Sequence, residues 1–447
     1  MSSLRLSRRD AIILGGTAMA CAVERTPGNG TADAPTPTRP AEPSPWQAGG
    51  TVDGVTFPTG VQVGDATDAG AVVSVHTLAP ITLVVAVAAA GDWTEHARIG
   101  PLDPIDGVVQ IALAGLPADS AISVVAYVDD SRRSAVTRFR SALAPAADAR
   151  VVVFGITSCL GGNEPWPGLT RAATEQLDFF ALIGDTVYAN NATTIADYRA
   201  DWNEALLVAG LIDLTASTSI IATWDDHEVG NDWNWETIPP EQFAAARTAY
   251  REALPQGAGP DGDSIWRRLS WGKTLDIFVL DSRGERRDGR YLSPAQAIWL
   301  KSELTASKSR FKIVLNSVPI TDLSTLFGAA LESDRWQGYP AERQDILAHT
   351  ADIPGILWLA GDHHYGQIGH VDPEGGAAHA QWEVLVGPSG SNVNLLATLY
   401  TGDDPQYTDV IAAWNWVRVT CDPGRGTVRI QHVADDGTGL SDVTLIL

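Results

Sequence analysis

The sequence predicts a mixed α/β region at residues 146–447, preceded by a small antiparallel β-sandwich at residues 51–145. Two patterns lead to this prediction. Before residue 145, short apolar runs follow one another with turn residues between them and no helical period, as in antiparallel sheets. After residue 150, strand-like and helix-like segments alternate, which is typical of βαβ units with parallel strands.

The first region contains five strand-like runs, at residues 70–78, 81–89, 108–116, 121–128 and 135–143. β-Branched and other apolar residues dominate these runs, and turn-forming residues such as Gly, Pro and Asp separate them. We therefore expect short strands that are joined by turns and share one apolar core.

The second region begins with three expected strands, at residues 151–156, 177–183 and 218–224, and three expected helices, at residues 168–176, 193–211 and 239–254. A hairpin is expected at residues 264–282. The next helix, at residues 293–307, has Ser293 as its cap and Pro294 in its first turn. Further strands are expected at residues 311–319, 355–362, 381–387, 414–422 and 427–435.

The N-terminus has the features of an export signal at residues 1–21. Arg8 and Arg9 form the twin-arginine pair of a bacterial Tat signal, with Sec export as the alternative. The apolar stretch at residues 11–20 is about half of the ~20 residues that span a bilayer. Cys21 follows small residues where a lipoprotein signal is cleaved, so we expect it to be lipidated; a chance cysteine in an ordinary signal peptide is the alternative.

Composition agrees with an exported enzyme that acts on small molecules. The formal net charge of −23 repels nucleic acid and anionic lipid, and we expect no nucleic-acid-binding module. Residues 22–50 are rich in Thr, Pro, Ala and Gly and are expected to form a flexible linker. Membrane contact is therefore expected only through a lipid anchor, and the protein is expected to be a monomer.

Three motifs place acidic and imidazole side chains directly after apolar strands: GDTVYAN at residues 184–190, TWDDHEVGND at residues 223–232 and AGDHHYGQ at residues 360–367. Strands that end at one edge of a sheet bring such side chains together. A hydrolase with two or more cations needs a bridging carboxylate, further ligands and a proton donor for the leaving group. The sequence therefore predicts such a hydrolase, with Asp185 suited to the bridge.

Six motifs in this order resemble the PhoD-type alkaline phosphatase family of the calcineurin-like metallophosphoesterases. They are the three motifs above together with TSC at residues 157–159, LDSRGERR at residues 280–287 and RWQGYPAER at residues 335–343. The resemblance extends from about residue 57 to the C-terminus. It implies a four-layer α-β-β-α metallophosphoesterase sandwich at residues 146–447, after the small antiparallel β-sandwich.

The resemblance also implies a set of metal ligands, in which a cysteine and a tyrosine bind ferric iron. Thiolate and phenolate are strong anionic donors for such a cation. The implied ligands are Cys159, Asp185, Tyr188, Asp226, Asp362 and His364. His227 matches the histidine that orients phosphate and protonates the leaving oxygen. Asp225 and Glu228 are expected to hold the ligands in position.

Three of these assignments have alternatives. Instead of binding metal, Cys159 would form a disulfide with Cys421 in an oxidising compartment. Arg283 is assigned to catalysis as a bidentate partner of a phosphate oxygen, and a structural salt bridge with a neighbouring acid, Asp281 or Glu285, is the alternative. His363 is either a substrate contact or a simple replacement of the family residue.

The resemblance implies hydrolysis of phosphodiesters, extending to monoesters, for phosphate acquisition in the periplasm or at the cell surface. A metal-bound hydroxide or oxide would attack phosphorus while His227 protonates the leaving group. The implied metals are Fe(III) and Ca(II), with Mn, Zn or Mg as alternatives. Two other interpretations remain: a metallophosphoesterase with another metal pair that acts on nucleotides or phospholipids, and a non-catalytic surface binding lipoprotein.

Overall fold

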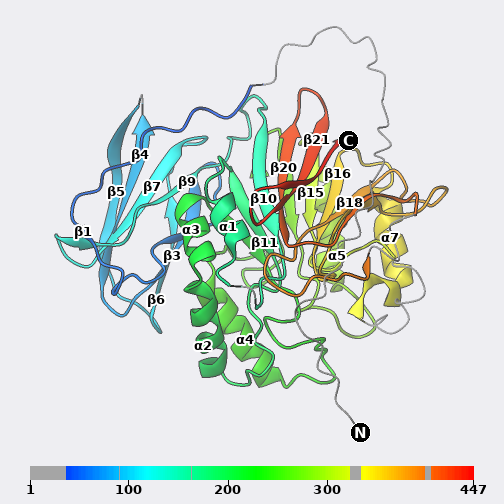
Figure 1. Cartoon of the computed structure of the whole chain (residues 1–447), viewed down its shortest axis with the longest axis horizontal. Helices are drawn as coiled ribbons and strands as arrows, with labels where there is room; N and C mark the ends of the chain where they lie inside the picture. The colour runs from blue at the N-terminus through cyan, green and yellow to red at the C-terminus, as the bar shows by residue number, and fades with distance from the viewer. Residues whose placement is uncertain (1–36, 90, 163, 323–333, 398–403) are drawn as a thin grey trace, which may run out of the picture. The chain divides into compact units, whose positions relative to one another are not determined.

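The computed structural model of the protein describes residues 37–447, except residues 90, 163, 323–333 and 398–403 (Figure 1). These residues form three β-sheets with helices, which confirms the predicted mixed α/β class. Within the described part of the chain, the helices are all too short or too polar to cross a bilayer. The predicted signal at residues 1–21 and its lipidation site Cys21 lie outside the described residues.

The first sheet has six strands among the described residues, and most pairs of neighbouring strands in it are antiparallel. The strands are β1 (Thr51–Val52), β4 (Ile81–Ala89), β5 (Asp92–Leu102), β7 (Ala121–Tyr127), β8 (Arg132–Arg133) and β9 (Thr137–Arg140). Alternating side chains of β4 and β7, such as Leu83, Val85 and Val124, are fully buried. They share one apolar cluster with Val63 and Val73 of the second sheet.

The second sheet has nine strands in the order β22-β21-β20-β10-β11-β12-β2-β3-β6. Their bounds are β2 (Gln62–Gly64), β3 (Gly70–His76), β6 (Val108–Ala114), β10 (Val152–Thr157), β11 (Phe179–Ile183), β12 (Ile220–Thr223), β20 (Asn415–Asp422), β21 (Thr427–Ala434) and β22 (Gly439–Ile446). β10, β11 and β12 are parallel to one another. The sheet also contains N-terminal strands, because Ile220 of β12 pairs with Gly64 of β2. Strands from both sides of residue 145 thus belong to one sheet, and the domain boundary predicted at that residue stays a prediction.

The third sheet has seven strands in the order β13-β14-β15-β16-β18-β17-β19. Their bounds are β13 (Arg267–Trp271), β14 (Leu275–Val279), β15 (Phe311–Leu315), β16 (Ile356–Ala360), β17 (Gly366–His370), β18 (Trp382–Leu385) and β19 (Tyr407–Ile411). β13 and β14 form the hairpin that the sequence predicted. β14, β15, β16 and β18 are parallel, so their carboxyl ends share one edge.

Apolar clusters bind the second and third sheets to each other and to the helices. Ile156 and Ala181 of the second sheet share a buried cluster with Ile313 and Leu357 of the third. The helices contribute to two other clusters, one with β11 and one with β14 and β15. They are α1 (Pro167–Ala172), α2 (Ile195–Leu206), α3 (Ala209–Ser217), α4 (Pro240–Ala253), α5 (Pro294–Ala306), the 3₁₀ helix η2 (Trp336–Gly338) and α7 (Pro340–Thr350). Ser293 caps α5 as predicted, accepting a hydrogen bond from the Gln296 N–H.

The structure differs from the prediction in several elements, and strands β1, β2, β8, β17, β19 and β22 were not predicted. The helix expected at residues 193–211 is interrupted, because Val208 is extended between α2 and α3. β5 was missed because it alternates polar and half-buried side chains with few large apolar residues. Helix α7 was also missed, since its polar sequence PAERQDILAHT buries only Ile346, Leu347 and Thr350.

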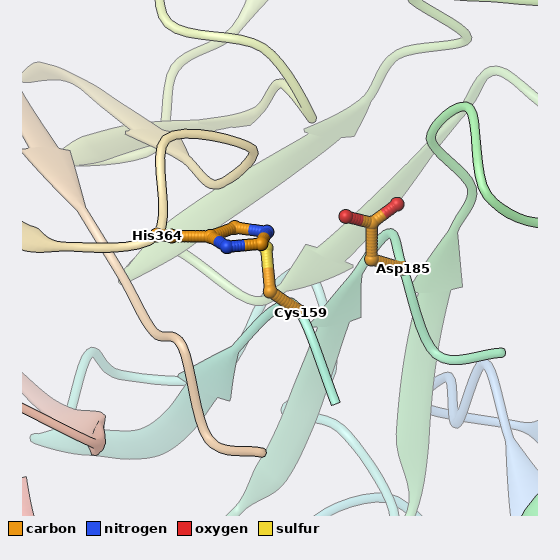
Figure 2. Close-up of side chains that lie close together, drawn as sticks. All are labelled: Cys159, Asp185 and His364. Atoms are coloured by element: carbon orange, nitrogen blue, oxygen red, sulfur yellow. The ribbon is translucent and has the colours of Figure 1, made fainter. Parts of the chain in front are cut away.

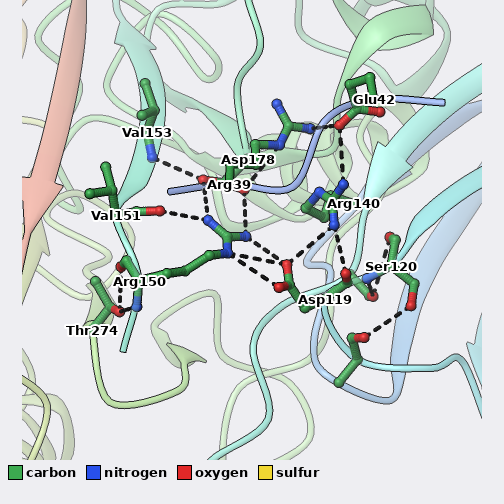
Figure 3. Close-up of polar contacts among 12 residues, drawn as sticks. Arg39, Glu42, Asp119, Ser120, Arg140, Arg150, Val151, Val153, Asp178 and Thr274 are labelled. Atoms are coloured by element: carbon green, nitrogen blue, oxygen red, sulfur yellow. Dashed lines mark hydrogen bonds and ion pairs between the residues drawn. The ribbon is translucent and has the colours of Figure 1, made fainter. Parts of the chain in front are cut away.

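A buried ion-pair network joins the linker to both regions (Figure 3). The Arg150 guanidinium donates to Asp178 at 2.9 Å and to Asp119 at 2.8 Å. Arg39 also lies 3.5 Å from the Asp178 carboxylate. The main chain adds to this attachment, because the Val151 N–H donates to the Pro37 carbonyl at 2.8 Å. The last part of the predicted flexible linker, residues 37–50, is therefore attached to the folded protein.

A buried histidine outside these clusters predicts a pH dependence of stability. His432 on β21 is fully buried with its Nε2 3.0 Å from the Leu385 carbonyl, and burial lowers its pKa from 6.5 to about 4. Between these values the unfolded chain binds the proton and the folded chain does not, so stability falls as pH falls.

We expect His432 to contribute a loss of about 3 kcal/mol in the free energy of unfolding between pH 6.5 and 4. In His432→Gln, the amide still donates to the Leu385 carbonyl but does not titrate. The free energy of unfolding of this variant should therefore change less between pH 6.5 and 4. Urea denaturation across the pH range measures the effect. Equal slopes for the two proteins would show that His432 does not titrate as described.

Candidate metal centre

The predicted site residues follow parallel strands of two different sheets. Cys159 lies just beyond β10, Asp185 beyond β11 and Asp226 beyond β12, whereas Asp362 and His364 lie beyond β16 of the third sheet. Hydrogen bonds connect the loops from the two sheets. The Ser317 hydroxyl donates to the Asp225 carboxylate at 3.1 Å, and the Ser158 hydroxyl donates to the Val386 carbonyl at 3.0 Å. The carboxyl edges of the two sheets therefore meet at one site.

Four of the predicted ligands converge on one point, and Figure 2 shows three of them, Cys159, Asp185 and His364. One donor atom each from Cys159, Asp185 and His364 lies within 4.8 Å of the other two. The Tyr188 hydroxyl lies 3.3 Å from Asp185 Oδ2 and 3.3 Å from His364 Nε2. His364 Nδ1 lies 2.8 Å from the Asn392 carbonyl, which fixes the ring with Nε2 toward the other donors.

Two further groups of donors are present, and each shares one residue with the group before it. The second group is Asp185, Asp226 and His227, and the third is Asp225, Asp226 and Asp362, each within 4.8 Å. Asp185 belongs to the first and second groups, and Asp226 to the second and third. Asp362 and His364, two of the predicted ligands, lie in different groups. Asp225, predicted only to hold ligands, is itself among the donors.

The backbone at these positions is unusual. Cys159, Asp185, Asp362 and His364 all have positive φ angles, between 54° and 62°. Non-glycine residues adopt this conformation at a cost of roughly 1–3 kcal/mol each, and such residues are concentrated at functional sites. Gly184 is required as well, because a Cβ on it would lie 2.5 Å from the Asp225 Cβ. These four side chains are therefore held on strained backbone, as is common at functional sites.

Electrostatics show that the donors fit a cation. Burial, together with the neighbouring acids, raises the pKa values of Cys159 and Asp185 well above their usual ranges. The pKa of Tyr188 is raised for the same reason, with Asp185 as its main anionic neighbour. Asp225 Oδ2 is buried without a hydrogen-bond partner. Bound cations would compensate these anions, and thiolate, phenolate, carboxylate and imidazole are all suitable ligands.

Arg283 does not have the surroundings expected of a phosphate contact. Its side chain is fully buried, and its guanidinium forms ion pairs with Asp225 and Asp334. The remaining nitrogen, Nη2, lies 3.4 Å from Asp362 and 3.9 Å from Asp226. Although burial alone would lower it, these carboxylates raise the pKa of Arg283 well above its usual value. A buried salt bridge is therefore present, with Asp225 and Asp334 in place of the expected Asp281 or Glu285, and the catalytic assignment of Arg283 stays a prediction.

Glu228 holds two loops of the site together. Its carboxylate accepts hydrogen bonds from the main-chain N–H groups of Asp185 at 3.0 Å, Thr186 at 2.7 Å and Asp225 at 2.9 Å. It is fully buried, so these contacts replace solvation. Its contacts agree with the holding role expected from the sequence.

The two histidines beside the ligands differ in access. His227 is half-buried, stacks on Tyr188 with a ring-centroid distance of 4.0 Å, and has its Nδ1 2.6 Å from Asn190 Oδ1. Burial lowers the pKa of His227. His363, in contrast, is 7% exposed with Nε2 3.4 Å from the Asp362 carboxylate. His227 is therefore more accessible to a substrate than His363.

The predicted alternative disulfide is wrong. Cys159 and Cys421 are both free thiols and both buried. Cys421 lies on β20 opposite Val152 at the start of β10, whereas Cys159 follows the end of β10. Cys421 therefore lies beside the start of β10, whereas Cys159 lies beyond its other end.

Sequence reasoning missed several residues of the site. Asp334 pairs with both Arg283 and Arg286. The Asp232 main chain donates to Asp226 Oδ2 at 2.6 Å. Asp232 and Asp334 stand within or beside the recognised motifs, which was the available signal, but residue type alone does not reveal their partners.

Comparisons with known proteins agree on one family. Residues 154–435 match the family described as PhoD-like phosphatase. The chain is 26% identical to alkaline phosphatase D of Bacillus subtilis (strain 168) over 298 residues, which cover 54% of this chain and 51% of that protein. It thus spans about half the length of this curated relative.

Solved structures share the fold. A structure of PhoD has a TM-score of 0.75 at 19% identity and covers 90% of both chains. The purple acid phosphatase PPD1 from yellow lupin (Lupinus luteus) seeds has a TM-score of 0.65 at 14% identity, covering 86% of this chain and 73% of the other. The fold is thus similar to those of PhoD and purple acid phosphatase. With the sequence match over residues 154–435, these observations show that the chain belongs to the PhoD-like phosphatase family.

Proposed function

We propose that the protein is a metal-dependent hydrolase of phosphate esters, acting on diesters and also on monoesters. The observation that carries this proposal is the sharing of carboxylates: Asp185 joins the first and second donor groups, and Asp226 joins the second and third. Shared carboxylates between adjacent groups of donors suit a centre with more than one metal ion. Membership of the phosphatase family supports the same chemistry.

The residues divide into ligands and a proton donor. We assign Cys159, Tyr188 and His364 with Asp185 to Fe(III), and the carboxylates of Asp226 and Asp362 with Asp185 to Ca(II). Such metals supply an activated water and neutralise charge that develops on the phosphate. His227 gives a proton to the leaving oxygen, which its half-buried position beside the ligands permits. Mn, Zn or Mg are the alternative metals.

Hydrolysis of two chromogenic esters tests the proposal. We expect the purified whole chain to release 4-nitrophenolate from bis(4-nitrophenyl) phosphate at alkaline pH, and more slowly from 4-nitrophenyl phosphate. Elemental analysis of the same sample gives its metal content. If neither ester is hydrolysed by protein that contains bound metal, the non-catalytic binding lipoprotein becomes the better account.

The iron assignment predicts a colour. We expect visible absorption from charge transfer between the Tyr188 phenolate and Fe(III), and its loss in Tyr188→Phe. Tyr198→Phe is a matched control, because Tyr198 on α2 is also buried, but its hydroxyl donates to the Val229 carbonyl and does not face Asp185 and His364 as the Tyr188 hydroxyl does. A colourless, iron-free preparation that hydrolyses the diester would refute the assignment.

Setting and scaffold are part of the same proposal. The twin-arginine sequence and Cys21 support export from a bacterial cytoplasm and a lipid anchor, so the enzyme would acquire phosphate in the periplasm or at the cell surface as a monomer. The apolar clusters that include α1 to α4, or α5 and α7, support a four-layer α-β-β-α sandwich. The cluster that the first sheet shares with β2, β3 and β6 supports a small β-sandwich before it.

A further inference from the structure

An exposed asparagine accepts two hydrogen bonds beside the donor groups. Asn190 Oδ1 lies 2.6 Å from His227 Nδ1 and accepts a hydrogen bond from the Asn231 main-chain N–H at 3.1 Å. A main-chain N–H can only donate, so the atom that faces it must be the amide oxygen. The same oxygen faces His227, and therefore the proton of the neutral ring must be on Nδ1.

Two other contacts restrain the imidazole. The ring stacks on Tyr188, with the planes inclined by 29°, and the His227 carbonyl accepts a hydrogen bond from the Ala189 N–H at 2.9 Å. The loop after β11 thus holds both the main chain and the side chain of His227. With Nδ1 engaged by Asn190, Nε2 is the nitrogen left to hold and deliver a proton.

We infer that Asn190 is a positioning residue for the proton donor, because it fixes the Nδ1–H tautomer and directs Nε2 of His227 to the leaving oxygen. This inference rests on the proposed function, in which His227 protonates the leaving group. An amide suits the position, since it accepts hydrogen bonds without adding another negative charge beside Asp185 and Asp226. Asn190 is exposed, so core packing does not explain its contacts.

Leaving groups of different basicity separate this role from a structural one. Ethyl 2,4-dinitrophenyl phosphate releases a stable anion that needs no proton, whereas ethyl phenyl phosphate releases a phenolate that benefits from protonation. General-acid catalysis typically contributes about 10²–10⁴-fold, so we expect Asn190→Ala to lower kcat for the phenyl ester at least about tenfold. For the dinitrophenyl ester the change should stay within about threefold.

Three variants complete the experiment. Asn190→Asp keeps an acceptor for both donors and should restore most of the phenyl-ester rate. Asn191→Ala changes the neighbouring exposed asparagine and should leave both rates unchanged. In a His227→Ala background, Asn190→Ala should cause no further loss, because the two residues act as a unit.

The possible failures are distinguishable. An equal loss of both rates in Asn190→Ala, or a phenyl-ester rate that Asn190→Asp does not restore, overturns the positioning role and leaves the proposed function intact. If the wild-type protein hydrolyses neither ester, the proposed function fails and the inference fails with it. Circular dichroism of each variant shows whether it is folded. If Asn190→Ala does not fold, Asn190→Asp still tests the positioning role.

Discussion

Asp185→Asn is expected to lower diester turnover at least about a thousandfold, equivalent to roughly 4 kcal/mol of transition-state stabilisation. Asp185 is shared by two groups of donors, so loss of its negative charge weakens both. Folding should survive the change. Asparagine has the same shape and tolerates the left-handed backbone at this position, where φ is 54°. Removing one buried charge also reduces repulsion among the neighbouring acids.

Asp65→Asn is the matched control for this variant. Asp65 is likewise a buried aspartate with a positive φ of 46°, but it pairs with Arg267 at 2.6 Å, away from the donor groups. Its loss leaves Arg267 buried without its counter-ion, which typically costs about 3–5 kcal/mol of stability. We therefore expect Asp185→Asn to lose turnover and keep its denaturation midpoint, and Asp65→Asn to show the reverse. Full turnover in folded Asp185→Asn would exclude Asp185 as the bridge.

Arg150→Met is expected to lower the free energy of unfolding by about 3–5 kcal/mol, the typical cost of removing one partner from a buried ion pair. Asp178 is 0% exposed, and Arg150 supplies its hydrogen bonds at 2.9 and 3.2 Å. After the substitution, Arg39 at 3.5 Å and the Val153 N–H at 2.9 Å are the remaining partners of that carboxylate. The expected result is a clear fall in the urea midpoint.

The control is Arg132→Met, because Arg132 is a surface arginine that, like Arg150, pairs with two acidic residues. Arg132 pairs with Asp129 and Asp53, but its side chain is 52% exposed, so water and salt screen the interaction. Arg132→Met should unfold at nearly the wild-type urea concentration. If Arg150→Met and Arg132→Met have equal midpoints, the network in Figure 3 does not stabilise the attachment of the linker.

The convergence of the site was predictable because its residues follow strands. Cys159, Asp185 and Asp362 each come directly after an apolar segment, and the ends of parallel strands meet at one edge of a sheet. The helix that begins after Ser293 was predictable too, since the signal is local. Both predictions need only the sequence within about ten residues of each position.

Features that depend on distant partners were not predictable. Arg283 has an acid two residues away in the sequence, yet it pairs with Asp225 and Asp334 because the fold brings three loops together. The pairing of Ile220 with Gly64, which extends the second sheet into the N-terminal region, also joins segments that are far apart in the sequence. Local patterns contain no information about such choices.

The most direct test of the central claim is the rate of diester hydrolysis before and after bound metal is removed by a chelator, with metal content measured on each sample. The donor groups around Asp185 and Asp226 predict that turnover falls in proportion to metal content. They also predict that turnover returns when Fe(III) and Ca(II) are restored. Undiminished hydrolysis by a folded, metal-free sample would contradict the proposal that these residues form a catalytic metal centre.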